Sequence, residues 1–307
     1  MNLRCPRIRF RLAALFTCLL IGLPASEAAP ADGGGRNWSF AILGQPDRLG
    51  SGDEHLRRAL ATSNRERVAF VLATGLKSSL EACSDALYEE RMDLLEQSRH
   101  PLLLSLSAAD WAECRREDGS SAAQERLARV REWFFSNLNR NGLNVAQQSQ
   151  VAQFRAFAEN LRWEVKGVMF ATLNLPGDNN HYVPDAGRNS EFEDRMIANR
   201  YWLHRLLQSA KSRRVRTLVL FFDADPQLWR ASRLAPGQRD GYLEIRRQLR
   251  ELAGQFNGKL LLVHQGDGRT KAGLRWRGNV GELVPWAGVT KVSVQGRNNS
   301  LHASESE

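Results

Sequence analysis

The chain has 307 residues, of which 42% are hydrophobic and 25% charged, so its composition excludes a disordered or fibrous protein and fits a globular one. The formal charge is +9, but the arginines are spread along the whole chain. No segment therefore has the concentrated positive charge of a dedicated nucleic-acid-binding arm. Four arginines and one glutamate in the first 28 residues account for +3 of this charge, which leaves a mildly basic +6 for the rest.

Residues 1–28 have the three parts of a secretory signal peptide. Arginines come first, the apolar run Leu12–Leu23 follows, and Ser26-Glu27-Ala28 forms a small-x-small cleavage site. The apolar run is too short to span a bilayer, so we expect no membrane anchor. We expect cleavage near Ala28 and a periplasmic or secreted mature protein. Residues 29–36 are rich in Pro, Ala and Gly and predict a flexible lead-in.

A β-strand, α-helix, β-strand unit is predicted next. Val68–Leu72 and Pro101–Leu106 are apolar runs of strand length, and Ser84 is a favourable N-cap for the helix between them. Such strands lie parallel in one sheet, and ligands bind outside their carboxyl ends. In this sequence those ends, residues 74–76 and 107–110, carry few chemically active side chains.

Two cysteines, Cys83 and Cys114, remain after the predicted leader. Each follows one of the two strands just described, so both lie at the same end of the predicted sheet. An exported protein with two cysteines favours a disulfide between them. The alternative is that they are two unrelated buried thiols.

The other predicted elements alternate between strands and helices. They are strands at Trp38–Leu43, Thr217–Phe222, Leu260–Val263 and Val289–Val294, helices at Glu54–Ala61 and Ala122–Asn139, from Ser190 onward and over Tyr242–Leu252, a hairpin of Asn160–Val165 with Val168–Leu173, polar loops at 139–153 and 177–189, and a polar tail at 297–307. No repeat or interior linker interrupts residues 37–296, which predicts one domain. The alternation with hairpins predicts an α/β fold with mixed sheets.

Eight short segments carry a resemblance to a known family. They are Leu76–Ser78, Cys83–Leu87, Asp110–Cys114, Glu159–Trp163, Val168–Leu173, Gly177–Asn180, Ala224–Pro226 and Leu261–His264. These segments are similar to the calcineurin-like metallophosphoesterases, and most of all to a group exported by bacteria. The resemblance implies a four-layer sandwich in which two mixed β-sheets are flanked by helices.

The same resemblance implies metal ligands that this sequence lacks. Gln45, Gly75, Ala108, Ala109 and Gly268 stand where the family has Asp, Asp, Asp, Asn and His. A dinuclear site needs several carboxylates, one of them bridging, because two neighbouring divalent cations repel strongly. Glutamine is a weak neutral ligand, and glycine and alanine have no ligating side chain. We therefore expect the dinuclear metal site to be lost.

Four other residues could rebuild a metal site at the same edge of the sheet: His264, Asp267, Asp223 and Asp225. One histidine with carboxylates can bind a metal such as Mn, Fe or Zn. The alternative is structural, because Asp225 and Asp267 each precede a turn-forming residue and His264 can be a hydrogen-bonded remnant.

The sequence therefore predicts a non-catalytic pseudoenzyme that serves binding or scaffolding and needs no cofactor. Its partner is left open between an anionic small ligand and an envelope component. The alternative function is an active, metal-dependent phosphoesterase with rebuilt ligands. The sequence contains neither a Gly-x-Ser-x-Gly motif nor a phosphate-binding glycine-rich loop, so these motifs indicate no different chemistry.

Overall fold

Two β-sheets form the centre of the protein. The computed structural model describes residues 37–44, 52–136, 142–183, 189–230, 239–266 and 270–306, all within the unit Gly34–Glu307. The predicted signal peptide and lead-in lie outside the described residues, as do Gln45, Asp267 and Gly268.

The first sheet has five strands. In spatial order they are β12 (Ser300–Ser306), β11 (Val289–Gln295), β1 (Trp38–Leu43), β2 (Val71–Thr74) and β3 (Leu102–Ser105). The strands β1, β2 and β3 run parallel, whereas β11 is antiparallel to both of its neighbours. The sheet is therefore mixed, and the predicted β-strand, α-helix, β-strand unit supplies β2 and β3 of its parallel half.

The second sheet has seven strands. In spatial order they are β4 (Ala146–Gln147), β5 (Leu161–Val165), β6 (Val168–Thr172), β7 (Thr217–Phe221), β8 (Lys259–Val263), β10 (Val280–Val284) and β9 (Gly273–Arg277). The central strands β6, β7, β8 and β10 run parallel, and the outer pairs are antiparallel. The hairpin predicted across Lys166 and Gly167 is confirmed as β5 and β6.

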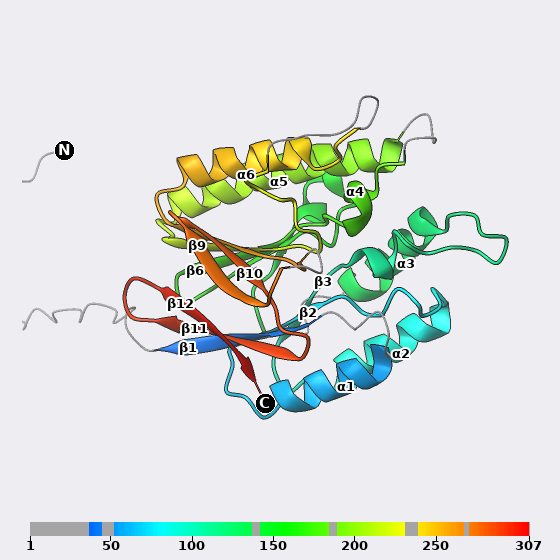
Figure 1. Cartoon of the computed structure of the whole chain (residues 1–307), viewed down its shortest axis with the longest axis horizontal. Helices are drawn as coiled ribbons and strands as arrows, with labels where there is room; N and C mark the ends of the chain where they lie inside the picture. Colours follow the sequence, from blue (N-terminus) through cyan, green and yellow to red (C-terminus); the bar gives the residue numbers. More distant parts are fainter. Residues whose placement is uncertain are drawn as a thin grey trace, which may run out of the picture. The chain divides into compact units, whose positions relative to one another are not determined.

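Helices cover the outer faces of both sheets. They are α1 (Gly52–Ser63), α2 (Asp85–Leu95), α3 (Ala123–Phe135), α5 (Ser190–Ser212) and α6 (Leu243–Gln255), with a short segment α4 (Gly177–His181). Figure 1 shows α5 and α6 side by side over the seven-stranded sheet, and α1 and α2 over the five-stranded sheet. The predicted fold class, two mixed sheets flanked by helices, is confirmed.

Aromatic side chains fill the space between the two sheets. Phe40 and Phe70 from the first sheet stack with ring centroids 5.1 Å apart, and Phe170 from the second lies edge-on to both. Trp163 and Phe221 extend the cluster along the second sheet. All five are buried, so the two sheets are joined by one apolar layer whose aromatic pairs add to the burial energy.

The structure also corrects several predicted elements. The strand β2 starts at Val71 rather than Val68. The predicted cap of α2 is confirmed, since the Ser84 hydroxyl accepts the Leu87 N–H. The polar tail expected at 297–307 instead contains β12, which pairs with β11 along its length. The polar loop expected at 139–153 contains β4 and the fully buried Gln148.

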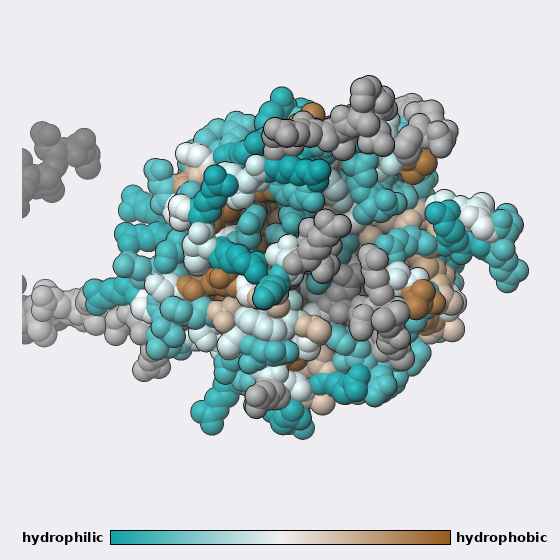
Figure 2. Space-filling view, viewed as in Figure 1, coloured by the Kyte–Doolittle hydropathy of each residue, from teal (hydrophilic) through white to brown (hydrophobic). Residues whose placement is uncertain are grey.

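Polar residues dominate the surface. Figure 2 shows a mainly hydrophilic face on which hydrophobic residues form small separate spots. No helix in the described ranges is long and apolar enough to cross a membrane.

Candidate functional site

The parallel strands of the two sheets end close to one another. The Ala108 N–H after β3 donates to Asp223 Oδ2 after β7, over 2.8 Å. The Gln265 side chain after β8 donates to Thr74 Oγ1 at the end of β2, over 3.2 Å. We call residues 74–75, 107–110, 177, 223 and 265 the strand-end region, which is where the family resemblance places its chemistry.

Asp223 joins three strand ends. Its Oδ2 atom accepts the Gly177 N–H after β6, over 3.0 Å, as well as the Ala108 N–H. Burial raises the pKa of the Asp223 carboxyl to about 7, although these two N–H groups act in the opposite direction. The carboxyl therefore serves as an internal bridge between backbone segments.

Gly75 stands where the resemblance implies a metal-bridging carboxylate, and any side chain at this position would be strained. Its φ is +103°, and a Cβ atom there would lie 2.8 Å from Ser107 Oγ. Ala108 and Ala109 at the neighbouring strand end are buried and offer no ligating atom. The described residues of this region therefore do not fit a dinuclear metal centre.

Asp110 is the second internal carboxyl of the region and is completely buried. Its two oxygens accept the Leu76 N–H and the Ser107 N–H, each over 2.8 Å. Burial raises the pKa of the Asp110 carboxyl to about 6, although the two hydrogen bonds and the positive charge of Lys77 act to lower it. Sequence reasoning missed this role, although the Ser-x-x-Asp spacing of Ser107 and Asp110 is a capping signal.

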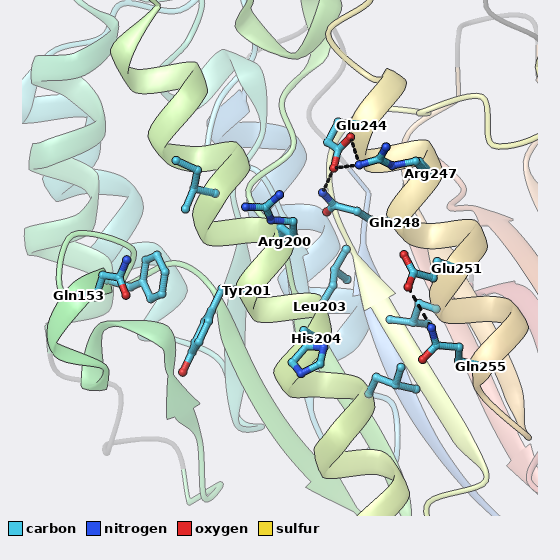
Figure 3. Close-up of a pocket in the computed structure, with 14 residues that line it drawn as sticks. Gln153, Arg200, Tyr201, Leu203, His204, Glu244, Arg247, Gln248, Glu251 and Gln255 are labelled. Carbon is cyan, nitrogen blue, oxygen red and sulfur yellow. Dashed lines mark hydrogen bonds and ion pairs between the residues drawn. The ribbon is translucent and has the colours of Figure 1, made fainter.

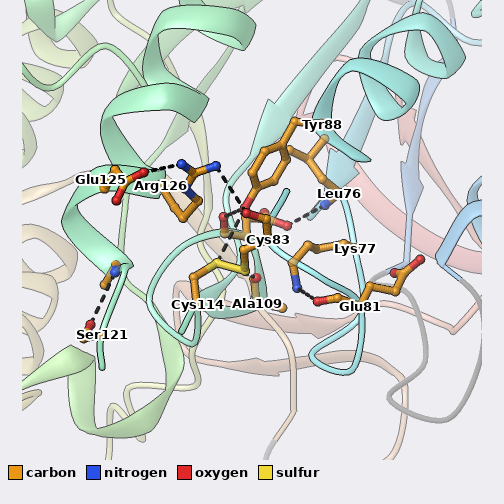
Figure 4. Close-up of a disulfide and its surroundings, with 12 residues drawn as sticks. Leu76, Lys77, Glu81, Cys83, Tyr88, Ala109, Cys114, Ser121, Glu125 and Arg126 are labelled. Atoms are coloured by element: carbon orange, nitrogen blue, oxygen red, sulfur yellow. Dashed lines mark hydrogen bonds and ion pairs between the residues drawn. A yellow bond between two sulfur atoms is a disulfide. The ribbon is translucent and has the colours of Figure 1, made fainter. Parts of the chain in front are cut away.

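The predicted disulfide between Cys83 and Cys114 is present (Figure 4). It joins the segment after β2 to the segment after β3, with the two Cα atoms 5.7 Å apart. The Tyr88 hydroxyl donates to the Asp110 carbonyl, over 2.7 Å, and lies 3.5 Å from Cys114 Sγ. The disulfide thus reinforces the same two turns that Asp110 holds.

Lys77 lies in the same corner and is almost fully buried. Its ammonium group donates to the carbonyl oxygens of Ser78 and Glu81, over 2.8 and 2.9 Å. Burial lowers the pKa of the Lys77 amine, and the nearby Asp110 carboxyl partly offsets this. The Lys77 ammonium group is thus held by backbone carbonyl groups of its own turn.

The three described residues among the proposed rebuilt ligands, Asp223, Asp225 and His264, each make other contacts. His264 is 3% exposed, its ring stacks on Phe222 with centroids 5.7 Å apart, and its Nδ1 lies 2.9 Å from the Gln265 carbonyl oxygen. Asp225 accepts the Gln227 N–H within a turn. Within the described ranges, no group of three or more His, Cys, Asp or Glu side chains could hold a metal ion.

Three cavities in the described part of the chain lie away from the strand-end region. One of about 550 Å³ lies between α5 and α6, and one of about 540 Å³ lies between α3 and α5. The third, of about 840 Å³, is bordered by the end of α2, by β3 and by α3. None of these three cavities includes a residue of the strand-end region.

Comparison with known proteins finds several similar solved structures, two of which are described here. No family model matches the chain, and no curated protein sequence matches it. GAP50, described as the anchor in the inner membrane complex of Plasmodium, has a TM-score of 0.46 at 12% identity, covering 88% of this chain and 89% of that one. A phosphatase from Mycoplasma pneumoniae has a TM-score of 0.38 at 11% identity, covering 89% and 92%. Both similarities extend over most of the chain, and neither carries information on chemistry at these values.

Proposed function

We propose that this protein is an exported, metallophosphoesterase-like pseudoenzyme that acts by binding and needs no cofactor. The observation that carries the proposal is the use of Asp223. In the wider superfamily that this sequence resembles, a metal-binding histidine stands at this position, and here the Asp223 carboxyl accepts the N–H groups of Ala108 and Gly177. Its partner is an anionic small ligand or a component of the cell envelope.

Electrostatics supports the proposal that the protein has lost a hydrolytic site with two metal ions. Two divalent cations about 3.5–4 Å apart repel by about 16 kcal/mol at an effective dielectric of about 20. Carboxylates must offset this repulsion, yet Gly75, Ala108 and Ala109 supply none. A side chain added at Gly75 would first have to displace Ser107.

Export is supported by the disulfide, because disulfides persist in oxidising compartments. We expect the mature protein to begin within a few residues of Ala29, which N-terminal sequencing of extracytoplasmic material would measure. A protein that keeps Met1 and stays in the cytoplasm would contradict export and leave the proposal about the strand-end region untouched.

Metal content and activity test the pseudoenzyme directly. The full mature protein, purified without a histidine tag, is incubated with manganese, iron or zinc and examined by elemental analysis and by phosphomonoester and phosphodiester assays. We expect well under one metal per chain and no turnover above a mock purification. Stoichiometric metal with activity abolished by His264→Ala or Asp267→Ala, but not by the exposed control His302→Ala, would establish the alternative, an active phosphoesterase.

A further inference from the structure

A groove runs between the outer faces of α5 and α6, with a volume of about 550 Å³ (Figure 3). Its polar walls are formed by Arg200 and His204 of α5 and by Glu244, Gln248 and Glu251 of α6. We call this feature the α5–α6 groove. Its size lies in the range of sites for small ligands, about 300–1,000 Å³.

The walls and the floor of the groove differ in character. Glu244, Gln248, Glu251 and Gln255 are spaced so that they form one stripe along α6. Below them the groove is lined by buried leucines of both helices: Leu203, Leu207 and Leu252. A ligand in the groove would therefore meet hydrogen-bonding groups at its edges and an apolar surface beneath.

Gln248 carries an unused acceptor in this groove. The side chain is 8% exposed, and its Nε2 donates to Glu244 Oε1 over 2.8 Å. Its Oε1 atom is buried and has no hydrogen-bond partner among the described residues. Figure 3 shows the amide projecting from α6 into the space between the two helices. A buried unpaired acceptor costs about 1–3 kcal/mol, which a ligand hydroxyl would recover.

The charges of the groove balance. Two arginines and two glutamates line it, Arg200 and Arg247 with Glu244 and Glu251, and Arg247 already pairs with Glu244 over 2.8 Å. Sites for polyanions instead concentrate positive charge. The balance favours an uncharged ligand that has many donors and acceptors.

Aromatic rings line the groove on the side of α5 that faces away from α6. The Tyr201 ring lies against Phe154 with centroids 4.6 Å apart and planes inclined by 36°. Tyr201 is only partly buried, so it presents a flat apolar face beside a hydroxyl. A sugar ring has the matching surfaces, with apolar C–H faces and a rim of hydroxyl groups.

We propose that the α5–α6 groove binds a neutral oligosaccharide. Amide, carboxylate and guanidinium groups of the walls bond the sugar hydroxyls, and Tyr201 with Phe154 supports a ring face. Gln248 Oε1 accepts one hydroxyl. The groove lies on the helical face of the seven-stranded sheet, so this inference does not depend on the function proposed for the strand-end region.

Glycan binding by the full mature protein tests the proposal. An array of neutral oligosaccharides, including chitotetraose, maltotetraose and cellotetraose, is probed beside heparin and sulfated dextran. Hits are measured by calorimetry. We expect at least one neutral oligosaccharide to bind with a Kd below about 1 mM. Gln248→Ala and Tyr201→Ala should each weaken this binding about five- to tenfold, whereas Gln208→Ala, on an exposed part of α5 outside the groove, should leave it unchanged.

Three outcomes would overturn the proposal. One is the absence of binding to every neutral oligosaccharide on the array. A second is binding that Gln248→Ala and Tyr201→Ala leave unchanged while both variants keep the melting temperature of the wild type. The third is binding of the sulfated polymers alone with loss in Arg200→Ala, which would identify a polyanion site.

Discussion

The strand-end region and the α5–α6 groove use similar polar side chains in opposite ways. In the strand-end region, the carboxyl oxygens of Asp110 and Asp223 accept backbone N–H groups that would otherwise lack a partner. In the groove, Gln248 Oε1 has no partner within the described part of the chain, and Arg200 and His204 are exposed. The two buried carboxyls at the usual ligand position of an α/β sheet thus stabilise turns here, whereas Arg200 and His204 on the helical face are exposed to a ligand.

Replacing Asp110 should produce the largest effect. In Asp110→Ala, the N–H groups of Leu76 and Ser107 lose their acceptor and Lys77 loses a nearby carboxylate. We expect the free energy of unfolding to fall by about 3–5 kcal/mol. Urea denaturation measures this, with Gln208→Ala as the matched surface control. A loss below about 1 kcal/mol would show that the buried carboxyl does not hold the turns.

Removing the disulfide should have the next largest effect on the same turns. The bond between Cys83 and Cys114 closes a loop of 31 residues, so loop-closure entropy predicts a loss of about 3–4 kcal/mol in Cys83→Ala/Cys114→Ala. Denaturation with and without reductant measures it, and reductant should not change the double variant. Titration of the unreduced, unfolded wild type should find almost no free thiol, and two thiols per chain would refute the bond.

A smaller effect should appear as a pH dependence. Burial raises the pKa of Asp223 to about 7, above its ordinary value, so the folded state binds this proton more tightly than the unfolded state. The resulting stabilisation is complete below pH 4 and is lost as the pH rises through 7. Asp223→Asn keeps an acceptor but cannot ionise. We therefore expect it to gain at least about 1 kcal/mol relative to the wild type between pH 5 and 8.

Denaturation of both proteins over that pH range measures the difference. A relative stability that stays constant, or that shifts toward the wild type as the pH rises, would mean that Asp223 is ionised throughout. Asp110, whose pKa burial raises to about 6, is present in both proteins and therefore cancels in the comparison to a first approximation.

Local signals in the sequence predicted part of this arrangement. Ser84 at the start of α2 could be identified because the first backbone N–H groups of a helix lack partners within it, and the Ser84 hydroxyl accepts one of them. The pairing of Cys83 with Cys114 followed from the expected parallel strands. The continuous apolar run of β6, buried along its full length, is typical of a strand covered on both faces.

Contacts between distant segments account for what the sequence did not predict. The strand β12 lies at a sheet edge, where only Leu301 is fully buried and the other side chains tolerate water, so its sequence resembles a tail. Gln148 belongs to a buried network with Asn160, which no local pattern indicates. The role of Asp223 depends on Ala108, a residue 115 positions away.

The smallest expected change in stability belongs to the groove and gives the sharpest contrast with the strand-end region. In Gln248→Leu, an apolar side chain of similar size replaces an amide whose Oε1 has no partner among the residues that the structure describes. Replacing such a group by an apolar one is often neutral or stabilising, because no buried acceptor is left unpaired. We expect the free energy of unfolding to stay within about 0.5–1 kcal/mol of the wild type or to rise, while Asp110→Leu falls by several kcal/mol. If Gln248→Leu were as destabilising as Asp110→Leu, then Gln248 would be a structural residue, and the groove would be no more available to a ligand than the strand ends are.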